Sequence, residues 1–385
     1  MQNFRFQTVP FIINETGALA RLGEYIQQEF PACRRLFIVS DAGLVSSGIL
    51  QAGLDNLDQL GLQYQLYAGV VPDPPEAVVL LAAQQAREFG SDLVIGMGGG
   101  SAMDVAKLIA VLCGNDQALS TMYGINQIRG QRLPLVQIPT TAGTGSEVTN
   151  ISIVTTGETT KMGVVAPQLF ADLAILDASL TTELPVAGTA ATGIDAMVHA
   201  IEAYTTRHKK NPVSDMLARQ ALKLLFNHID RACSHGADLA ARQAMLLGAM
   251  MAGQAFANAP CAAVHALAYP IGGRFHVPHG LSNSLVLPDV LRFNLPAAAE
   301  QYAELAEILA PDATGSAEAR SNAMINALAD LALRTGIPTR LRQVGIRETD
   351  LEQLASDAMQ QTRLLGNNPR EVSWQDAYEI YAAVL

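Results

Sequence analysis

The sequence is poor in several residue types, and each scarcity excludes a class of protein. It has only four cysteines among 385 residues, at positions 33, 113, 233 and 261. Their spacing fits neither a disulfide framework nor a CxxC metal site, which favours a reduced, cytoplasmic setting. Charged residues make up 16% of the chain and the formal net charge is −11. An acidic chain without a long Lys/Arg run is a poor partner for nucleic acid or an anionic membrane surface.

Segments that would direct the chain to a membrane are also lacking. The N-terminal stretch MQNFRFQTVPFIINE contains no long apolar run, so we expect no signal peptide. Residues 243–273 contain no Asp, Glu, Lys or Arg, and a stretch of that length could span a bilayer. The same stretch contains Gln254, Asn258, Pro260, His265 and several glycines. A buried pair of helices inside a globular domain is therefore the better interpretation.

The hydrophobic pattern divides the chain near Leu184–Pro185. Before this point, strand-like runs alternate with helix-like segments, which predicts a parallel sheet with helices on both faces. After it, Ala, Leu and Met recur at helical spacing, which predicts an all-helical domain. We therefore expect an α/β domain over 1–184 and an all-helical domain over 185–385. The expected strands lie within 36–41, 63–70, 91–100 and 133–141, the expected helices cover 43–61 and 76–90, and capping boxes are expected at 349–352 and 373–376.

A glycine-rich loop, GMGGGSAMDVAK (96–107), follows one of these strands and opens a helix. Glycines allow a diphosphate to approach the backbone, and the helix N-terminus supplies N–H donors and the positive end of a dipole. The spacing is neither GxGxxG nor GxxxxGK[ST], so a plain tight turn is the alternative. The expected phosphate contacts are Gly98, Gly99, Gly100 and Ser101.

Two further features are compatible with a nucleotide cofactor. Asp41 ends the first clear strand, where a carboxylate could bind an adenosine ribose and repel a 2′-phosphate, favouring NAD over NADP. A helix N-cap is an equally good interpretation of Asp41. TTAGTGSE (140–147) is a second small-residue loop after a strand, and its hydroxyls suit a ribose or phosphate. Ordinary surface-loop chemistry is the alternative for this segment.

Asp195, His199, His265 and His279 form a candidate metal-ligand set in the second half of the chain. Asp195 and His199 are four residues apart in a segment of helical period, so both project from one helix face. The two other histidines lie in or beside the charge-free region. An unpaired buried Asp195 would be costly, and a divalent cation would be a natural partner for it. One carboxylate and three imidazoles suit Zn²⁺ or Fe²⁺, and such a metal can polarise a substrate oxygen.

Four motifs occur in this order: GGGSAMDVAK, PTTAGTGSEVT, LPVAGTAATGIDAMVHAIEAY and VHALAYPIGGRFHVPHG. Together they resemble the metal-dependent (iron-containing, or group III) alcohol dehydrogenase family, and the resemblance covers almost the whole chain. It implies an N-terminal dinucleotide-binding α/β domain and a C-terminal helical domain, as in the dehydroquinate synthase-like fold, with the active site in the cleft between them. It also implies reversible NAD(P)-dependent oxidoreduction of an alcohol, and assembly into a homodimer or larger homo-oligomer.

The resemblance assigns roles to individual residues. It makes Asp195, His199, His265 and His279 the metal ligands, and the PHG form of the motif favours His279 over the neighbouring His276. The residues that match cofactor positions are Gly98, Gly99, Ser101 and Asp104 in the first loop, Thr140, Thr141 and Ser146 in the second, and Lys161 and Leu180 elsewhere.

Tyr269 departs from the family pattern. Many members have a second histidine four residues after the third ligand, often assigned to substrate hydrogen bonding or proton relay. A tyrosine with an ordinary pKa of about 10 can donate a hydrogen bond but carries protons poorly at neutral pH. The proton relay, the substrate range and the pH optimum are therefore open. Glu202 either supports a metal ligand or faces solvent.

Two other functions are compatible with parts of the pattern. A dehydroquinate synthase-like lyase or a maleylacetate reductase-like enzyme would bind an anionic substrate and require several cations, of which only Arg274 stands out. A metal-stabilised assembly protein would need no cofactor loop. The apolar surroundings of Phe256, Cys261 and Tyr269 favour a small, uncharged or weakly polar alcohol.

Overall fold

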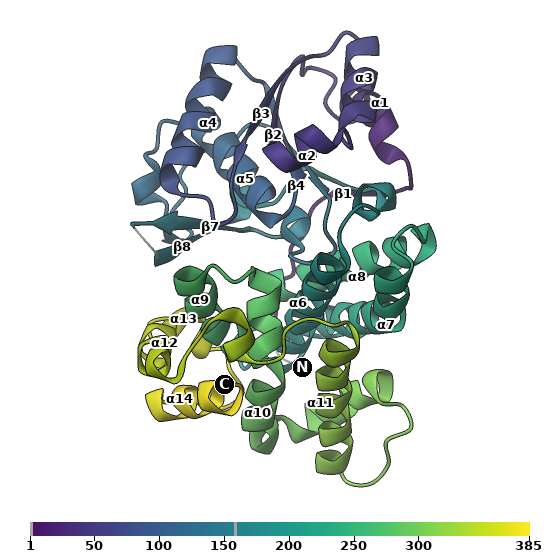
Figure 1. The fold of residues 1–385 in the computed structure, drawn as a ribbon. Coiled ribbons are helices and arrows are strands. Elements are labelled where there is room, and N and C mark those ends of the chain that lie inside the picture. The colour runs from purple at the N-terminus through teal and green to yellow at the C-terminus, as the bar shows by residue number, and fades with distance from the viewer. Residues whose placement is uncertain (1–2, 158–159) are drawn as a thin grey trace. The chain divides into compact units, whose positions relative to one another are not determined.

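The computed structural model describes residues 3–157 and 160–385 and divides into two compact units (Figure 1). The α/β unit comprises Thr8–Thr141 and Gly145–Glu183. The helical unit comprises Leu184–Leu385 together with Ala142–Thr144 and, among the described N-terminal residues, 3–7. The change of unit at Leu184 lies where the composition changes. Two short segments from the first half of the chain, 142–144 and the N-terminal one, also belong to the helical unit, which differs from the expected division at residue 184. They belong there because of how they pack, which composition does not reveal.

A six-stranded sheet forms the centre of the α/β unit. All its strands are parallel, in the order β1-β9-β6-β4-β2-β3. The two strands at its centre, β6 and β4, are buried along their whole length, as expected of apolar strands covered on both faces. The strands are β1 (Phe11–Asn14), β2 (Arg35–Asp41), β3 (Gln63–Val70), β4 (Leu93–Gly98), β6 (Leu135–Pro139) and β9 (Leu173–Leu176).

Helices cover both faces of this sheet, which confirms the predicted α/β class (Figure 1). Helices α4 (Glu76–Phe89) and α5 (Gly100–Gly114) lie on one face, and α1 (Leu22–Glu29), α2 (Ala42–Ser47) and α3 (Gln51–Gln59) lie on the other. The single helix predicted over 43–61 was wrong, because Gly48 adopts φ +76° and ends α2. Short 3₁₀ turns are η1 (Ala18–Arg21), η2 (Leu119–Thr121), η3 (Ser146–Val148), η4 (Pro167–Leu169) and η5 (Ala178–Thr181).

A small second sheet was not expected from the sequence. It has the strand order β5-β8-β7 and contains β5 (Gly124–Ile125), β7 (Ile151–Thr156) and β8 (Thr160–Val165). Strands β7 and β8 pair antiparallel, and β7 also contacts α5. This sheet therefore connects the segment after the second small-residue loop to the helix that follows the glycine loop.

The helical unit is built around α6 (Val186–Thr205), which packs against α7, α8 and α10. Side-chain caps fix several helix starts, including Asn211 on α7 and Asp238 on α8. The remaining elements are α7 (Pro212–Ser234), α8 (Leu239–Asn258), α9 (Ala263–Phe275), α10 (His279–Leu309), α11 (Ala317–Arg334), η6 (Leu341–Val344), η7 (Glu348–Asp350), α12 (Leu351–Ala358), α13 (Thr362–Leu365) and α14 (Trp374–Ala383).

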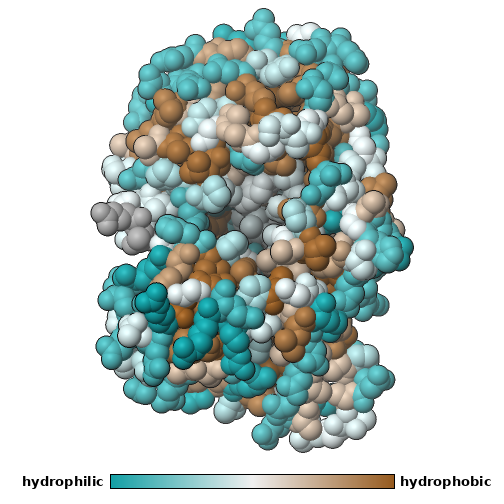
Figure 2. Space-filling model, viewed as in Figure 1, coloured by the Kyte–Doolittle hydropathy of each residue, from teal (hydrophilic) through white to brown (hydrophobic). Residues whose placement is uncertain are grey.

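The charge-free stretch over 243–273 forms parts of α8 and α9, interrupted around Pro260. Among the described residues, no helix is both long and apolar enough to cross a membrane. Hydrophilic side chains cover much of the visible surface of each unit, with apolar patches between them (Figure 2). Large exposed apolar residues are scattered over different elements, such as Met216 on α7 and Leu333 on α11, which is ordinary for a folded protein.

One of the two predicted capping boxes is present. Ser373 accepts from the backbone N–H of Asp376 at the start of α14, and Asp376 accepts from the backbone N–H of Ser373. The box expected at 349–352 was wrong. Asp350 instead accepts from the backbone N–H of Arg347, and α12 begins directly after a 3₁₀ turn.

Candidate functional site

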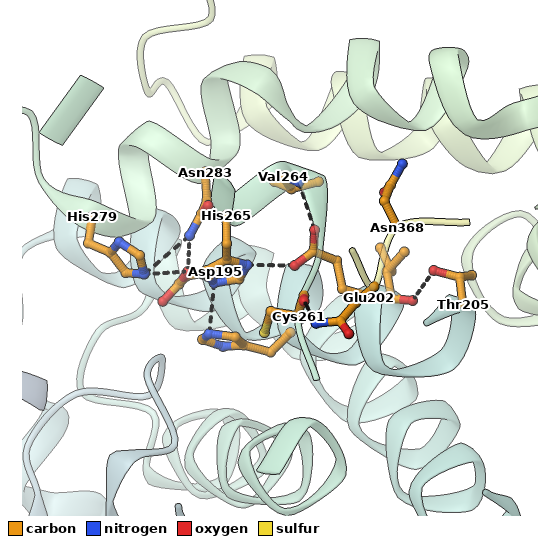
Figure 3. A network of polar contacts seen from close by, with 12 residues as sticks. Asp195, Glu202, Thr205, Cys261, Val264, His265, His279, Asn283 and Asn368 are labelled. Carbon is orange, nitrogen blue, oxygen red and sulfur yellow. Dashed lines mark hydrogen bonds and ion pairs between the residues drawn. The ribbon is translucent and has the colours of Figure 1, made fainter. Parts of the chain in front are cut away.

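The four predicted metal ligands come together inside the helical unit. Helix α6 carries Asp195 and His199, α9 carries His265, and α10 begins at His279. One ligand atom from each lies within 4.8 Å of all the others (Figure 3). The two Nε2 atoms of His199 and His265 are 3.0 Å apart, and His279 Nε2 is 3.7 Å from Asp195 Oδ1. Ligands about 2.0–2.1 Å from one tetrahedral cation would be about 3.3 Å apart, so the cluster has suitable dimensions.

A glycine allows α10 to reach α6 at this point. A Cβ atom on Gly280 would lie 2.4 Å from the backbone oxygen of Ala191 and 3.2 Å from Asp195 Cβ. The first of these distances is far below van der Waals contact. Only glycine therefore allows the first turn of α10 to bring His279 beside Asp195, which gives a physical reason for the PHG sequence.

Glu202 and Asn283 surround the cluster. Glu202 is buried on α6, where Oε2 accepts from His265 Nδ1 at 2.6 Å and Oε1 accepts from the Val264 N–H at 2.7 Å (Figure 3). Glu202 thus supports a candidate ligand rather than facing solvent. Asn283 was not singled out from the sequence, although it is four residues after His279. Its Nδ2 donates to Asp195 Oδ1 at 2.6 Å.

The protonation states follow from burial and mutual proximity. Burial would raise the pKa of Asp195, but the three imidazoles and the Asn283 amide outweigh it and hold that pKa below its usual value. Burial lowers the pKa of His199 to about 3, so its ring is neutral at pH 7. Burial opposes protonation of His265 as well, but Cys261 and Glu202 raise its pKa well above the usual value. A cation binding here would have to displace that proton.

Aromatic side chains line the cluster. The ring of Phe256 stacks on His199 with centroids 4.3 Å apart. The Tyr269 ring lies 6.5 Å from that of His265 and 5.9 Å from that of His279. The side chain of His279 is 34% exposed, whereas the other three candidate ligands are buried. The cluster is therefore most exposed on the side of His279.

Two residues considered earlier lie outside the cluster. His276 is exposed, adopts φ +54° and ends α9, so it is not among the clustered ligands. Arg274 forms an ion pair with Asp357. Its charge is therefore already partnered within the protein.

The glycine loop joins β4 to α5 in the α/β unit. Gly98 adopts φ +150°, and a Cβ there would lie 2.9 Å from Ala102 Cβ, so the turn requires glycine. Gly99 is the N-cap of α5, and the N–H groups of Gly100 and Ser101 in the first turn have no intrahelical acceptor. The loop thus presents backbone donors at a helix N-terminus.

Asp41 lies beside this loop and also caps a helix. Its Oδ1 accepts from the N–H of Leu44 at 2.9 Å, so the N-cap interpretation is correct. Its Oδ2 lies 3.8 Å from the position that a Cβ on Gly98 would occupy. The two interpretations of Asp41 are therefore compatible, because one carboxylate oxygen caps α2 and the other faces the glycine turn.

The second small-residue loop runs beside the first. The N–H of Thr140 donates to Gly98 O at 3.0 Å, and the side chain of Thr141 lies 3.9 Å from a Cβ position on Gly99. Ser146 Oγ donates to Asp104 Oδ1 at 2.6 Å. Asp104 therefore contacts the second loop directly.

Lys161 and Leu180 lie in the α/β unit but outside the two loops. Lys161, on β8, donates to Asp73 Oδ1 at 2.6 Å. Leu180, in η5, is buried in the hydrophobic core on the face of the sheet covered by α1 and α3. Neither side chain is part of the loop pair that adjoins Asp41.

Comparison with known proteins identifies the family. The family model described as iron-containing alcohol dehydrogenase matches residues 10–178, and the C-terminal model of the Fe-containing alcohol dehydrogenase family matches 189–385. The chain belongs to the iron-containing alcohol dehydrogenase family. It is 40% identical to long-chain-alcohol dehydrogenase 1 of Geobacillus thermodenitrificans over 371 residues, covering 95% of this chain and 93% of that protein.

Solved structures agree with this assignment to the iron-containing alcohol dehydrogenases. A 1,3-propanediol oxidoreductase superposes with a TM-score of 0.95 at 33% identity, covering 100% of both chains. A sulfoacetaldehyde reductase from Bifidobacterium kashiwanohense, solved in complex with NAD⁺, superposes with a TM-score of 0.89 at 28% identity, covering 100% of this chain and 99% of that one. The predicted family, fold and enzyme class are confirmed, and the lyase alternative is not favoured. The roles of individual residues stay predictions.

Proposed function

We propose that this iron-containing alcohol dehydrogenase interconverts a small alcohol and its aldehyde or ketone with NAD(H), using a divalent metal held by Asp195, His199, His265 and His279. The cluster of one carboxylate and three imidazoles, buried except at His279, is the observation that carries the proposal. When bound, a divalent cation supplies polarisation of the substrate oxygen. The family name favours Fe²⁺, and Zn²⁺ is the alternative because imidazole suits both.

The surrounding residues fit this donor set. Glu202 accepts a hydrogen bond from His265 Nδ1, which leaves Nε2 of that ring for a cation once the cation has displaced the Nε2 proton. His199 is neutral at pH 7, the form in which imidazole binds metals. Asp195 is anionic and would compensate part of the cation's charge. The Asn283 amide holds that carboxylate in place.

The coenzyme is proposed to bind along the α/β unit. The N–H groups of Gly100 and Ser101 would bind the diphosphate, and Gly98 and Gly99 would allow it close to the backbone. Asp41 would accept hydrogen bonds from the adenosine ribose and repel a 2′-phosphate, so NAD is preferred over NADP. The hydroxyl groups of Thr140, Thr141 and Ser146 would complete the site, and Asp104 would contribute by holding Ser146. Lys161 and Leu180 are proposed to lie near the coenzyme on the family resemblance alone.

Tyr269 is proposed to donate a hydrogen bond to the substrate oxygen. Its ring lies beside His265 and His279 on the more exposed side of the cluster. Phe256 and Cys261 add apolar surface, which favours a small, uncharged or weakly polar substrate. Arg274, the cation that an anionic substrate would use, already pairs with Asp357.

We also propose a homodimer or larger homo-oligomer, and a cytoplasmic location supported by free cysteines at all four positions.

Elemental analysis of gently purified protein, combined with an NAD⁺ and NADP⁺ assay on a panel of small alcohols, tests the proposal. We expect about one metal per chain and NADH formation that is lost on chelation and restored by Fe²⁺ or Zn²⁺. Asp195→Asn should lose both metal and turnover, whereas Asp312→Asn at an exposed position should retain both. Full metal content and activity in Asp195→Asn would contradict the ligand assignment.

A further inference from the structure

The start of α9, the helix that carries His265 and Tyr269, is not determined by a capping side chain of its own. Residues 259–262 connect α8 to α9, and the N-cap residue is Ala262. A methyl group accepts no hydrogen bond, so Ala262 cannot cap the first turn as Ser, Asp or Asn would. Contacts from other parts of the helical unit therefore have to determine where α9 begins, and with it the position of a candidate metal ligand.

Two buried side chains hold this start from different helices and turns. Glu202 on α6 accepts from the N–H of Val264 at 2.7 Å. Asn367, which follows α13 and is 8% exposed, donates from Nδ2 to the carbonyl oxygen of Cys261 at 2.9 Å. This carbonyl lies four residues, about one helical turn, before His265. A shift of the Cys261 carbonyl therefore moves the first turn of α9 and the imidazole that follows it.

Asn367 is itself held against the end of α6. Its backbone oxygen accepts from the N–H of Arg207 at 2.7 Å, two residues after α6 ends at Thr205. Its Nδ2 also donates to Arg363 O at 3.0 Å, within its own turn. One residue thus connects the end of α6 with the start of α9, the two helices that carry three of the four candidate ligands.

The neighbouring Asn368 extends this connection to α10. Asn294 on α10 donates from Nδ2 to Asn368 Oδ1 at 3.0 Å, and Asn368 donates from Nδ2 to Asn294 Oδ1 at 2.7 Å. Both side chains are almost fully buried, where an unpaired amide would be costly. Asn368 lies on the side of Glu202 away from His279 (Figure 3). Residues 367–368 are therefore fixed to α10 as well as to the segments that adjoin α6 and α9.

We propose that Asn367 is a positioning residue for metal binding, fixing the start of α9 so that His265 lies at ligand distance from α6. The inference rests on the metal site proposed above. The amide of Asn367 is turned to the carbonyls of Cys261 and Arg363, so it acts on the metal only through the backbone before α9. Loss of the amide releases one of the two contacts that hold this helix start. Metal affinity falls and the coordination geometry changes, while the coenzyme loops of the α/β unit keep their conformation.

The full-length Asn367→Ala variant tests this role with Co²⁺, a spectroscopic substitute for Fe²⁺ or Zn²⁺. Metal-free protein is titrated with Co²⁺ against a competing chelator, and the visible absorption of the bound ion reports its coordination geometry. We expect the Co²⁺ Kd to rise about tenfold or more, as on loss of the outer partners of metal-bound histidines, with an altered absorption band. The NADH Kd should be unchanged. Asn322→Ala, which removes an exposed asparagine on α11, should leave all three quantities unchanged.

A destabilised control separates positioning from a general loss of stability. Leu328 is buried on α11, so Leu328→Ala should lower the unfolding temperature by opening a cavity. Its Co²⁺ Kd and absorption should match those of the wild type, whereas Asn367→Ala changes both. An unchanged Co²⁺ Kd and spectrum in Asn367→Ala, with only a lowered unfolding temperature, would overturn the inference. Equal changes in the two variants would overturn it as well.

A milder variant keeps the test decisive if Asn367→Ala does not fold. Asn367→Ser retains a hydroxyl that can donate to Arg363 O within the turn, but its shorter side chain leaves the Cys261 carbonyl unbound. Its Co²⁺ Kd should still rise several-fold, and an unchanged Kd overturns the inference. A wild-type protein that binds neither Co²⁺, Fe²⁺ nor Zn²⁺ would instead contradict the proposed metal site itself.

Discussion

At the scale of single residues, Glu202 constrains His265 through two hydrogen bonds. One carboxylate oxygen accepts from the backbone beside His265, at Val264, and the other accepts from the ring Nδ1. Because the Nδ1 proton stays on the side of Glu202, Nε2 is the nitrogen that faces Asp195 and His199 and would bind a cation after losing its own proton. The tautomer of a candidate ligand is therefore determined by a residue on another helix, as is usual around metal-bound histidines.

Glu202→Gln should weaken metal binding without removing any ligand. A glutamine side chain has a single acceptor oxygen for the two donors, so one bond to the His265 side is lost. We expect the metal affinity to fall about 10–100-fold, as measured by titrating metal-free protein against a competing chelator. Glu318→Gln, which removes an exposed carboxylate on α11, is the matched control. Equal affinities in the two variants would show that Glu202 does not support the site.

Asp41→Asn should change the coenzyme preference without loosening the fold. Asparagine is as good an N-cap as aspartate, so the bond to the Leu44 N–H can be retained while the charge is lost. Without that charge, the 2′-phosphate of NADP⁺ is no longer repelled. We expect the ratio of kcat/KM for NADP⁺ over NAD⁺ to rise about tenfold or more. A ratio as low as that of the exposed control Asp116→Asn would argue against a ribose-binding role.

At the scale of helices and strands, the metal cluster depends on how closely three helices approach. The i, i+4 spacing of Asp195 and His199 is a local property of α6 and was predicted from the sequence. The positions of His265 and His279 depend on α9 and α10 packing against α6, which is a tertiary property. Gly280 is a feature of the local sequence that makes this tertiary packing possible, because its missing side chain allows the backbone of α10 to approach Ala191.

Gly280→Ala should separate α10 from α6 and damage the cluster. A Cβ atom 2.4 Å from a backbone oxygen cannot be accommodated by rotating a side chain. We expect a loss of about 1–3 kcal/mol in stability and a lower metal content, measured by denaturant unfolding and elemental analysis. Gly188→Ala on α6 is the control, since its Cβ would meet only the flexible end of Leu184 at 3.1 Å. Unchanged metal content in Gly280→Ala would show that α10 has room to move.

Elements that form one long apolar run could be predicted from the sequence, and others could not. Strand β3 and helix α4 match the expected segments because their patterns are unbroken. The small sheet containing β7 and β8 was missed, because its half-exposed strands have no strong period. The break at Gly48 was missed because a positive φ is adopted in only some sequence contexts.

At the scale of the whole molecule, metal binding and coenzyme binding are proposed for different units of the described chain. The candidate metal ligands and their supporting residues belong to the helical unit, and the two coenzyme loops belong largely to the α/β unit. Family motifs were sufficient to predict the candidate ligands and the two loops. The structure was needed to decide between the two interpretations of Glu202 and to find Asn283, because their partners on other helices lie 62 to 88 residues away in sequence.

Because of this division, removing the metal should affect stability and turnover more than coenzyme binding. A ligand that binds only the folded state stabilises it by about 4 kcal/mol at a thousand times its Kd, so chelation should lower the unfolding temperature. NADH should still bind the metal-free protein, with a Kd within about twofold of the metal-loaded value, because the proposed diphosphate and ribose contacts involve no metal ligand. Turnover should be lost and should return with Fe²⁺ or Zn²⁺. A tenfold loss of NADH affinity on chelation, reversed by the metal, would show instead that the two sites are energetically coupled.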